Sequence, residues 1–154
     1  MAKKNDIPLS IKLRSVEESN IPILYEMLKE MYATPQASVN ERPLVPYEDS
    51  KKFVMKYLHD NKNHEIDNWY MVIDDDKKIL GSVKISKKNY ISYQILRQFQ
   101  NMGLGSKAVK MLMELHPRER YFATINQNNE SSLKLVKKFG FKPKATVFEK
   151  IGEK

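Results

Sequence analysis

Two glycines lie where an apolar, strand-like segment changes into a helical pattern. Residues 90–96 form an aliphatic and aromatic run, and from Leu104 onward apolar residues recur at helical spacing. Between these segments, Gly103 and Gly105 let the backbone turn sharply and approach a ligand without a Cβ in the way. The first N–H groups of a helix have no partner within the helix and carry partial positive charge. The strand, the glycine loop and the helix therefore predict a phosphate-binding turn.

A second polar motif opens the last helical pattern of the chain. Asn129 and Ser132 precede apolar residues at helical spacing, and Gly140 ends this pattern. One interpretation is helix capping, because asparagine and serine side chains accept hydrogen bonds from the free N–H groups of a first turn. The other is catalytic. The Ser132 hydroxyl, with the positive end of the helix behind it, could donate a hydrogen bond to a departing anion.

Both motifs resemble signatures of one superfamily. Residues 100–105 fit the pattern Gln/Arg-x-x-Gly-x-Gly/Ala, which opens the main helix of the GNAT acyl-CoA N-acyltransferases. Residues 129–141 resemble the second signature, Asn-x-x-Ser followed by a short helix and Gly-Phe. The resemblance extends over about residues 8–150. The serine of Asn-x-x-Ser makes the chain similar to the branch that contains ribosomal-protein and amino-sugar N-acetyltransferases.

The resemblance implies an acetyl-CoA-dependent N-acetyltransferase. The acetyl group would pass directly to a primary amine of a small molecule or peptide, and the chain has no cysteine that could act as a nucleophile. Ser132 is the expected catalytic donor to the departing thiolate, and a backbone N–H near Ile95 is expected to polarise the thioester carbonyl. No metal is expected, since the three histidines lack metal-site spacing. The residues expected to bind coenzyme A are Ile95, Leu96, Arg97, Gln100, Asn101, Met102, Gly103, Leu104, Gly105, Ser106 and Asn129.

Two positions depart from the family pattern. In many GNAT enzymes a tyrosine four residues before the Gly-Phe acts as the general acid, and this chain has Val136 at that position. Relatives often carry a glutamate on the strand before the glycine loop that acts as the general base, and this chain has Tyr90 at that position. The carboxylates and imidazoles of the first half, Glu26, Glu30, His59 and His64, are expected at the surface. The general base therefore stays unassigned.

The acceptor site is expected near a long loop in the first half of the chain. Residues 33–46 contain three prolines and no sustained periodicity, and loops of this length are often functional. Tyr32 and Tyr47 lie at its two ends. We therefore predict that both tyrosines bind the amine.

Periodicity and turn residues predict the elements that position these motifs. Strands are expected at residues 9–14, 69–73, 79–85, 90–96, 121–125 and 145–150, with helices at 20–32, from 49 to 61, from 104 to 116 and from 127 to 140. This order predicts an α/β (α+β) fold with a mixed, mainly antiparallel sheet and helices on both faces. The GNAT resemblance further implies that the strands at 90–96 and 121–125 splay apart around acetyl-CoA.

Composition predicts one domain over residues 1–154. The hydrophobic content of 41% and the charged content of 30% are ordinary for a globular chain, and no apolar run is long enough to cross a membrane. A cytoplasmic monomer or homodimer is expected, without a membrane partner. The net charge of +8 is spread over the chain without a nucleic-acid-binding module, which argues against a nucleic-acid partner. The alternative left open is a non-catalytic, acyl-CoA-binding or RNA-associated basic protein.

Overall fold

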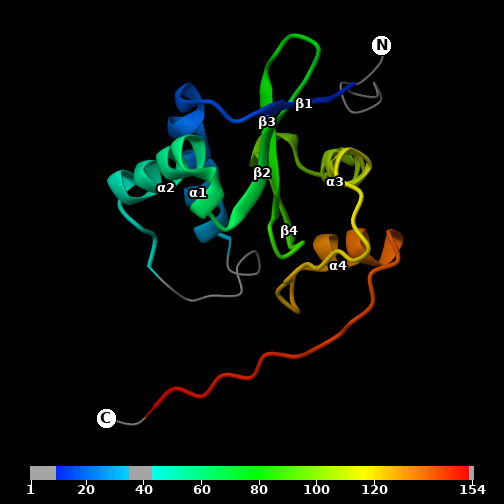
Figure 1. Ribbon diagram of the computed structural model, residues 1–154. Coiled ribbons are helices and arrows are strands. Elements are labelled where there is room, and N and C mark those ends of the chain that lie inside the picture. The colour runs from blue at the N-terminus through cyan, green and yellow to red at the C-terminus, as the bar shows by residue number, and fades with distance from the viewer. Residues whose placement is uncertain (1–9, 35–42, 153–154) are drawn as a thin grey trace.

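A four-stranded antiparallel sheet forms the centre of the protein. The computed structural model describes residues 10–34 and 43–152. The strands follow one another across the sheet in chain order, and each pairs antiparallel with the next (Figure 1). They are β1 (Lys12–Ser15), β2 (Ile66–Ile73), β3 (Ile79–Ser86) and β4 (Ile91–Ile95).

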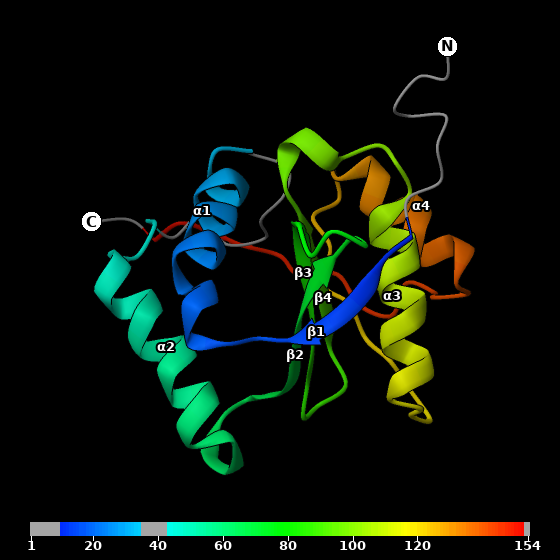
Figure 2. The same ribbon diagram turned by 90° about the horizontal axis from the view of Figure 1, so that it is seen from above.

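Two pairs of helices cover the two faces of the sheet (Figure 2). On one side lie α1 (Ile21–Tyr32) and α2 (Tyr47–His59), and on the other lie α3 (Leu104–Leu115) and α4 (Glu130–Lys138). No helix in the described part of the chain is long and apolar enough to cross a membrane.

The alternation of side chains along β2 and β3 produces a separate core on each face. Trp69 and Met71 pack with Val54 of α2 and Met27 of α1, whereas Val83 and Ile85 pack with α3. The two cores fix the register of the sheet, because a shift by one residue would turn every buried side chain towards the wrong layer.

The predicted fold class is confirmed, and most elements lie where the pattern placed them. The first strand begins at Lys12, and Leu9 lies outside the described residues. The second helix begins at Tyr47, two residues before its expected start, because Pro46 occupies the N-cap and acidic Glu48 and Asp49 suit the first turn. β2 begins at Ile66 rather than at residue 69.

Two predicted strands are wrong. Residues 145–150 form no strand, and this segment runs away from the body of the protein with Val147 and Phe148 78% and 89% exposed (Figure 1). Residues 121–125 contain only one isolated parallel bridge, between Phe122 and Tyr90. A segment with strand propensity forms a strand only where a neighbouring strand is present for it to pair with. Because residues 121–125 form a single bridge and no strand, residues 145–150 have no neighbouring strand there.

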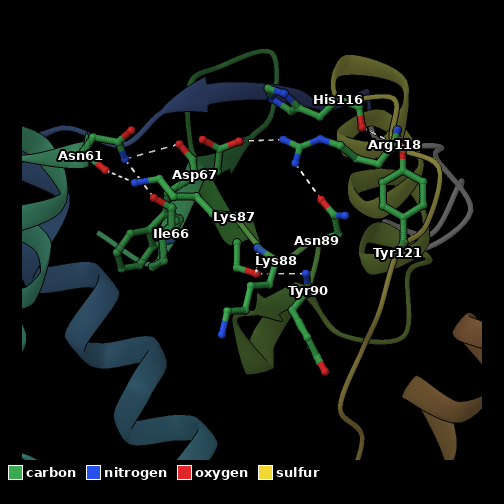
Figure 3. Close-up of polar contacts among 12 residues, drawn as sticks. Asn61, Ile66, Asp67, Lys87, Lys88, Asn89, Tyr90, His116, Arg118 and Tyr121 are labelled. Atoms are coloured by element: carbon green, nitrogen blue, oxygen red, sulfur yellow. Dashed lines mark hydrogen bonds and ion pairs between the residues drawn. The ribbon is translucent and has the colours of Figure 1, made fainter. Parts of the chain in front are cut away.

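Polar contacts fasten that bridge to the sheet (Figure 3). Arg118 donates to Asp67 of β2 at 2.7 Å and to Asn89 of the β3–β4 turn at 2.8 Å. Next to it, the Ile91 N–H donates to the Phe122 carbonyl at 2.8 Å, and the Phe122 N–H donates to the Asn89 carbonyl at 2.9 Å. The segment after α3 is therefore held at the start of β4, and its pairing with β4 stops there.

A buried histidine joins α2 to β2. His64 is 5% exposed, so its expected place at the surface is wrong. The Ile66 N–H donates to Nδ1 at 3.0 Å, which leaves the ring proton on Nε2, 3.2 Å from the Phe53 carbonyl. Burial lowers the pKa of His64, and burial together with the charge of Arg118 lowers the pKa of His116. Both imidazoles are thus held neutral.

Acidification should therefore weaken the fold before carboxylates are protonated. A histidine whose folded pKa lies below its unfolded value takes up a proton on unfolding, so the free energy of unfolding falls as pH drops below about 6.5 and levels off below the folded pKa. His64→Asn should reduce this loss between pH 7 and 5, measured by urea unfolding at each pH. The same pH dependence in the variant and the wild type would show that His64 does not contribute.

Candidate functional site

The outer edge of β4 presents unpaired backbone groups to a gap. Leu96 donates to the Leu80 carbonyl and Ser86 to the Tyr90 carbonyl, each at 2.9 Å, which fixes the residues that hydrogen-bond to β3. In an antiparallel pair these residues alternate with residues whose N–H and C=O point the other way. Tyr93 and Ile95 therefore direct their N–H groups away from β3, beyond the point where pairing with Phe122 ends.

The backbone N–H groups of Ile95, Leu96 and Arg97, all predicted to bind coenzyme A, differ in whether they are free. Ile95 faces the gap, whereas the Leu96 N–H is bonded to the Leu80 carbonyl. The Arg97 N–H donates to the Glu30 carboxylate at 2.8 Å. Tyr93, which the motif did not single out, takes their place as the second donor at the gap.

The glycine loop next to this gap is open. Gly103 has φ 75° and stands at the N-cap of α3, where no side chain caps the helix. A Cβ built on Gly103 would meet nothing within 4 Å, so the space above the loop is free. The Gln100 side chain donates to the Ile95 carbonyl at 3.0 Å and ties the loop to the strand, while Lys138 reaches the Ser106 hydroxyl at 3.1 Å. An uncapped helix start with a nearby lysine fits an anionic phosphate group.

A tyrosine and a serine meet between the loop and α4. The Tyr93 hydroxyl lies 2.8 Å from the Ser132 hydroxyl. Gly105 makes this approach possible, because a Cβ there would lie 2.8 Å from the Tyr93 ring. Burial raises the pKa of Tyr93 and keeps its phenol protonated, although the Ser132 contact opposes the rise.

Helix capping falls to Asn129 rather than to Ser132. Asn129 Oδ1 accepts from the Ser132 N–H at 3.2 Å and from the Ser131 hydroxyl at 3.3 Å. The Ser132 hydroxyl is left to contact Tyr93, so it is available for a role other than capping.

A cavity of about 380 Å³ lies on the opposite side of β3 and β4, under α1 and α2. Its walls are mainly apolar, and its serine, glutamine, lysine and aspartate residues come from β3, β4 and the start of α2. The lining residues are Leu24, Met27, Leu28, Met31, Tyr32, Val45, Asp49, Ser50, Phe53, Val54, Trp69, Ser82, Lys84, Ser92, Tyr93 and Gln94.

The cavity includes one of the two tyrosines predicted to bind the amine. Tyr32 lines it, whereas Tyr47 is not a lining residue and packs edge-on against Tyr25 at 5.3 Å. The Tyr25 hydroxyl donates to the carbonyl of Val45, which is a wall residue, so Tyr47 supports the cavity from behind. Residues 35–42 of the predicted acceptor loop lie outside the described residues.

Glu26 and Glu30, two carboxylates that the sequence analysis considered, do not line the cavity, whereas Asp49 does. Glu26 forms an ion pair with Lys29 at 2.7 Å, and Glu30 accepts from the Arg97 N–H. Tyr90, at the position of the family's glutamate, is 46% exposed and stacks on Phe122. Lys84 is the titratable group that the sequence analysis missed, and only the register of β3 reveals that it faces the cavity.

The family model described as "Acetyltransferase (GNAT) domain" matches residues 10–142. The chain therefore belongs to the GNAT N-acetyltransferase family. No curated protein matches the sequence.

Solved structures of acetyltransferases share the fold. RimL, a ribosomal L7/L12 alpha-N-protein acetyltransferase in complex with coenzyme A, has a TM-score of 0.69 at 22% identity and covers 88% of this chain and 82% of its own. A spermidine N-acetyltransferase from Vibrio cholerae in complex with CoA and spermine has a TM-score of 0.75 at 15% identity, with 92% and 86% covered. A putative acetyltransferase from Salmonella typhimurium with acetyl-CoA has a TM-score of 0.69 at 16% identity, with 88% and 81% covered.

Coenzyme A should raise the melting temperature of the wild-type protein, because a ligand that binds only the folded state stabilises it. Gly103→Val should abolish this increase, since the new side chain would enter the open space above the loop. Thermal unfolding with and without coenzyme A measures the effect.

The matched control is Gly140→Val at the end of α4. Gly140 has φ 84°, and a Cβ there also meets nothing within 4 Å, so this variant carries the same backbone strain away from the loop. It should retain the coenzyme A response. A full response in Gly103→Val would show that the loop does not bind the ligand.

Proposed function

We propose that the protein transfers an acetyl group directly from acetyl-CoA to a primary amine held in the cavity between the sheet and the helices α1 and α2. The observation that carries this proposal is the position of β4. Its outer edge is tied to the glycine loop by the hydrogen bond from the Gln100 side chain to the Ile95 carbonyl, and its Ser92 and Gln94 line the cavity. Two substrates bound on the two sides would meet at this strand.

The chain supplies groups that fit coenzyme A. The N–H groups at the start of α3, around Gly103 to Ser106, would bind the pyrophosphate, with Lys138 adding positive charge. The Tyr93 and Ile95 N–H groups would bind the pantetheine arm as a partner strand would. Acetyl-CoA, when bound, supplies the activated acyl group and a thiolate leaving group.

The Tyr93–Ser132 pair is the proposed donor to that thiolate. If the Tyr93 phenol donates to the Ser132 oxygen, the Ser132 proton is free to point into the gap. The raised pKa of Tyr93 keeps the phenol able to donate. This pair would replace the tyrosine that the family pattern places where this chain has Val136.

The cavity favours an amine that has lost its proton. Only a neutral amine can attack a thioester, and an apolar environment disfavours the charged form of an amine. Leu24, Met27 and Phe53 supply such an environment.

Release of free thiol from acetyl-CoA in the presence of a panel of primary amines tests the function. Ser132→Ala should lower kcat by about 10- to 1,000-fold with little change in coenzyme A affinity, because the lost contact is made mainly in the transition state. Ser131→Ala is the matched control and should stay near the wild-type rate, since the Ser131 hydroxyl donates to Asn129 rather than contacting Tyr93.

Two results would count against this account. Thiol release that depends on no amine in the panel would contradict acetyl transfer to amines. Equal, near-wild-type turnover by both serine variants would contradict the donor role of Ser132 and leave the transferase activity intact.

A further inference from the structure

Lys84 places a basic side chain at the floor of the cavity. Across the three strands, Lys84 stands opposite Trp69 of β2 and Ser92 of β4, while Ser82 stands opposite Gln94. All five residues line the cavity, so the polar floor consists of one lysine, two serines and one glutamine beside the indole. The walls above this floor are mainly aliphatic and aromatic.

No carboxylate among the described residues forms an ion pair with Lys84. Its ammonium lies 4.6 Å from the centre of the Trp69 ring, and the two ion pairs within residues 10–34 and 43–152, Lys29–Glu26 and Arg118–Asp67, do not include it. Burial lowers the pKa of Lys84, and Glu65 opposes this only through its more distant charge. A partly buried cation without a counter-charge is costly in a folded protein, and a bound anion would remove that cost.

The only carboxylate among the cavity's described lining residues is at its rim. Asp49 lies in the first turn of α2 and is exposed, whereas Lys84 lies on the sheet at the floor. This arrangement repels a second ammonium at the floor and accepts a negative group there. It therefore disfavours polyamines and favours an acceptor that carries both a primary amine and an anion.

The dimensions of the cavity and its apolar walls further restrict the class of acceptor molecule. Neighbouring strands are about 4.8 Å apart, so Lys84 on β3 lies one strand spacing from β4, where the acetyl group would be presented. A small molecule whose carboxylate binds Lys84 can therefore place its amine near β4. The apolar side chains of Met27, Phe53 and Trp69 fit an apolar substituent.

We propose that the acceptor is an amino acid with an apolar side chain and that Lys84 binds its carboxylate, a specificity that rests on the proposed acetyltransferase function. In this reaction the amine nitrogen of the amino acid forms the new bond to the acetyl carbon, and the carbon–sulfur bond of the thioester breaks. The thiolate leaves and accepts a proton, and the nitrogen loses one. The carboxylate takes no part in the chemistry.

Leucine and isoamylamine form a matched pair of acceptors, because they differ only in the carboxylate. Wild-type kcat/KM should be higher for leucine, and spermidine should be a poor acceptor. Lys84→Met should lower the ratio of kcat/KM for leucine over isoamylamine by about 10- to 100-fold, mainly through the KM for leucine, as expected for loss of a charge-assisted hydrogen bond. Lys84→Arg should keep part of the preference, and Lys110→Met, on the exposed face of α3, should keep all of it.

A separate binding measurement makes the inference independent of turnover. Calorimetry with coenzyme A present should detect leucine binding to the wild type and loss of that binding in Lys84→Met. Equal ratios in the wild type and Lys84→Met, or leucine binding that Lys84→Met leaves intact, would overturn the proposal while leaving the transferase function standing. A fall in kcat for both acceptors, without a change in their ratio, would also overturn it and would assign Lys84 to proton transfer.

Discussion

The end of pairing at the Tyr90–Phe122 bridge is the constraint on which the site depends. Arg118 anchors this bridge through Asp67 and Asn89, so within the described residues the outer edge of β4 has a neighbour only where the strand begins. An unpaired strand edge can form hydrogen bonds with strands of other chains and so promote aggregation. Here the edge is short, and its donors at Tyr93 and Ile95 face a gap beside a glycine loop that fits a phosphate. Under the proposed function, coenzyme A takes the place of a fifth strand at this edge.

Under the proposed function, the alternation of side chains along β4 keeps the two substrates on opposite sides of the strand. The Tyr93 hydroxyl meets Ser132 of α4, whereas Ser92 and Gln94, which lie on the other face of the strand, line the cavity under α1 and α2. Because successive residues of a strand face opposite sides, the five residues of β4 contribute side chains both to the contact with α4 and to the cavity. The backbone of the same strand faces the gap between them, which is where an acetyl group would have to pass from one substrate to the other.

Local patterns predicted the parts of this arrangement that depend on local geometry. Gly103 needs a left-handed backbone conformation, and the helix behind it has a clear apolar periodicity, so the loop and α3 could be recognised from residues close in sequence. Tyr93 and Lys84 could not be assigned, because their roles depend on strand register and on contacts with residues far along the chain. His64 was misplaced for the same reason, since its partners belong to α2 and β2. The strand expected at residues 145–150 failed because propensity alone does not supply a neighbouring edge.

Amide hydrogen exchange at β4 tests most directly the claim that the unpaired edge of this strand binds coenzyme A. Saturating coenzyme A should slow exchange at Tyr93 and Ile95 by at least about tenfold, because each N–H would gain a hydrogen-bond partner. Leu96 is the internal reference, since its N–H is already bonded to the Leu80 carbonyl and should change much less. Exchange at Tyr93 and Ile95 that does not slow relative to Leu96 at saturating coenzyme A would contradict the account.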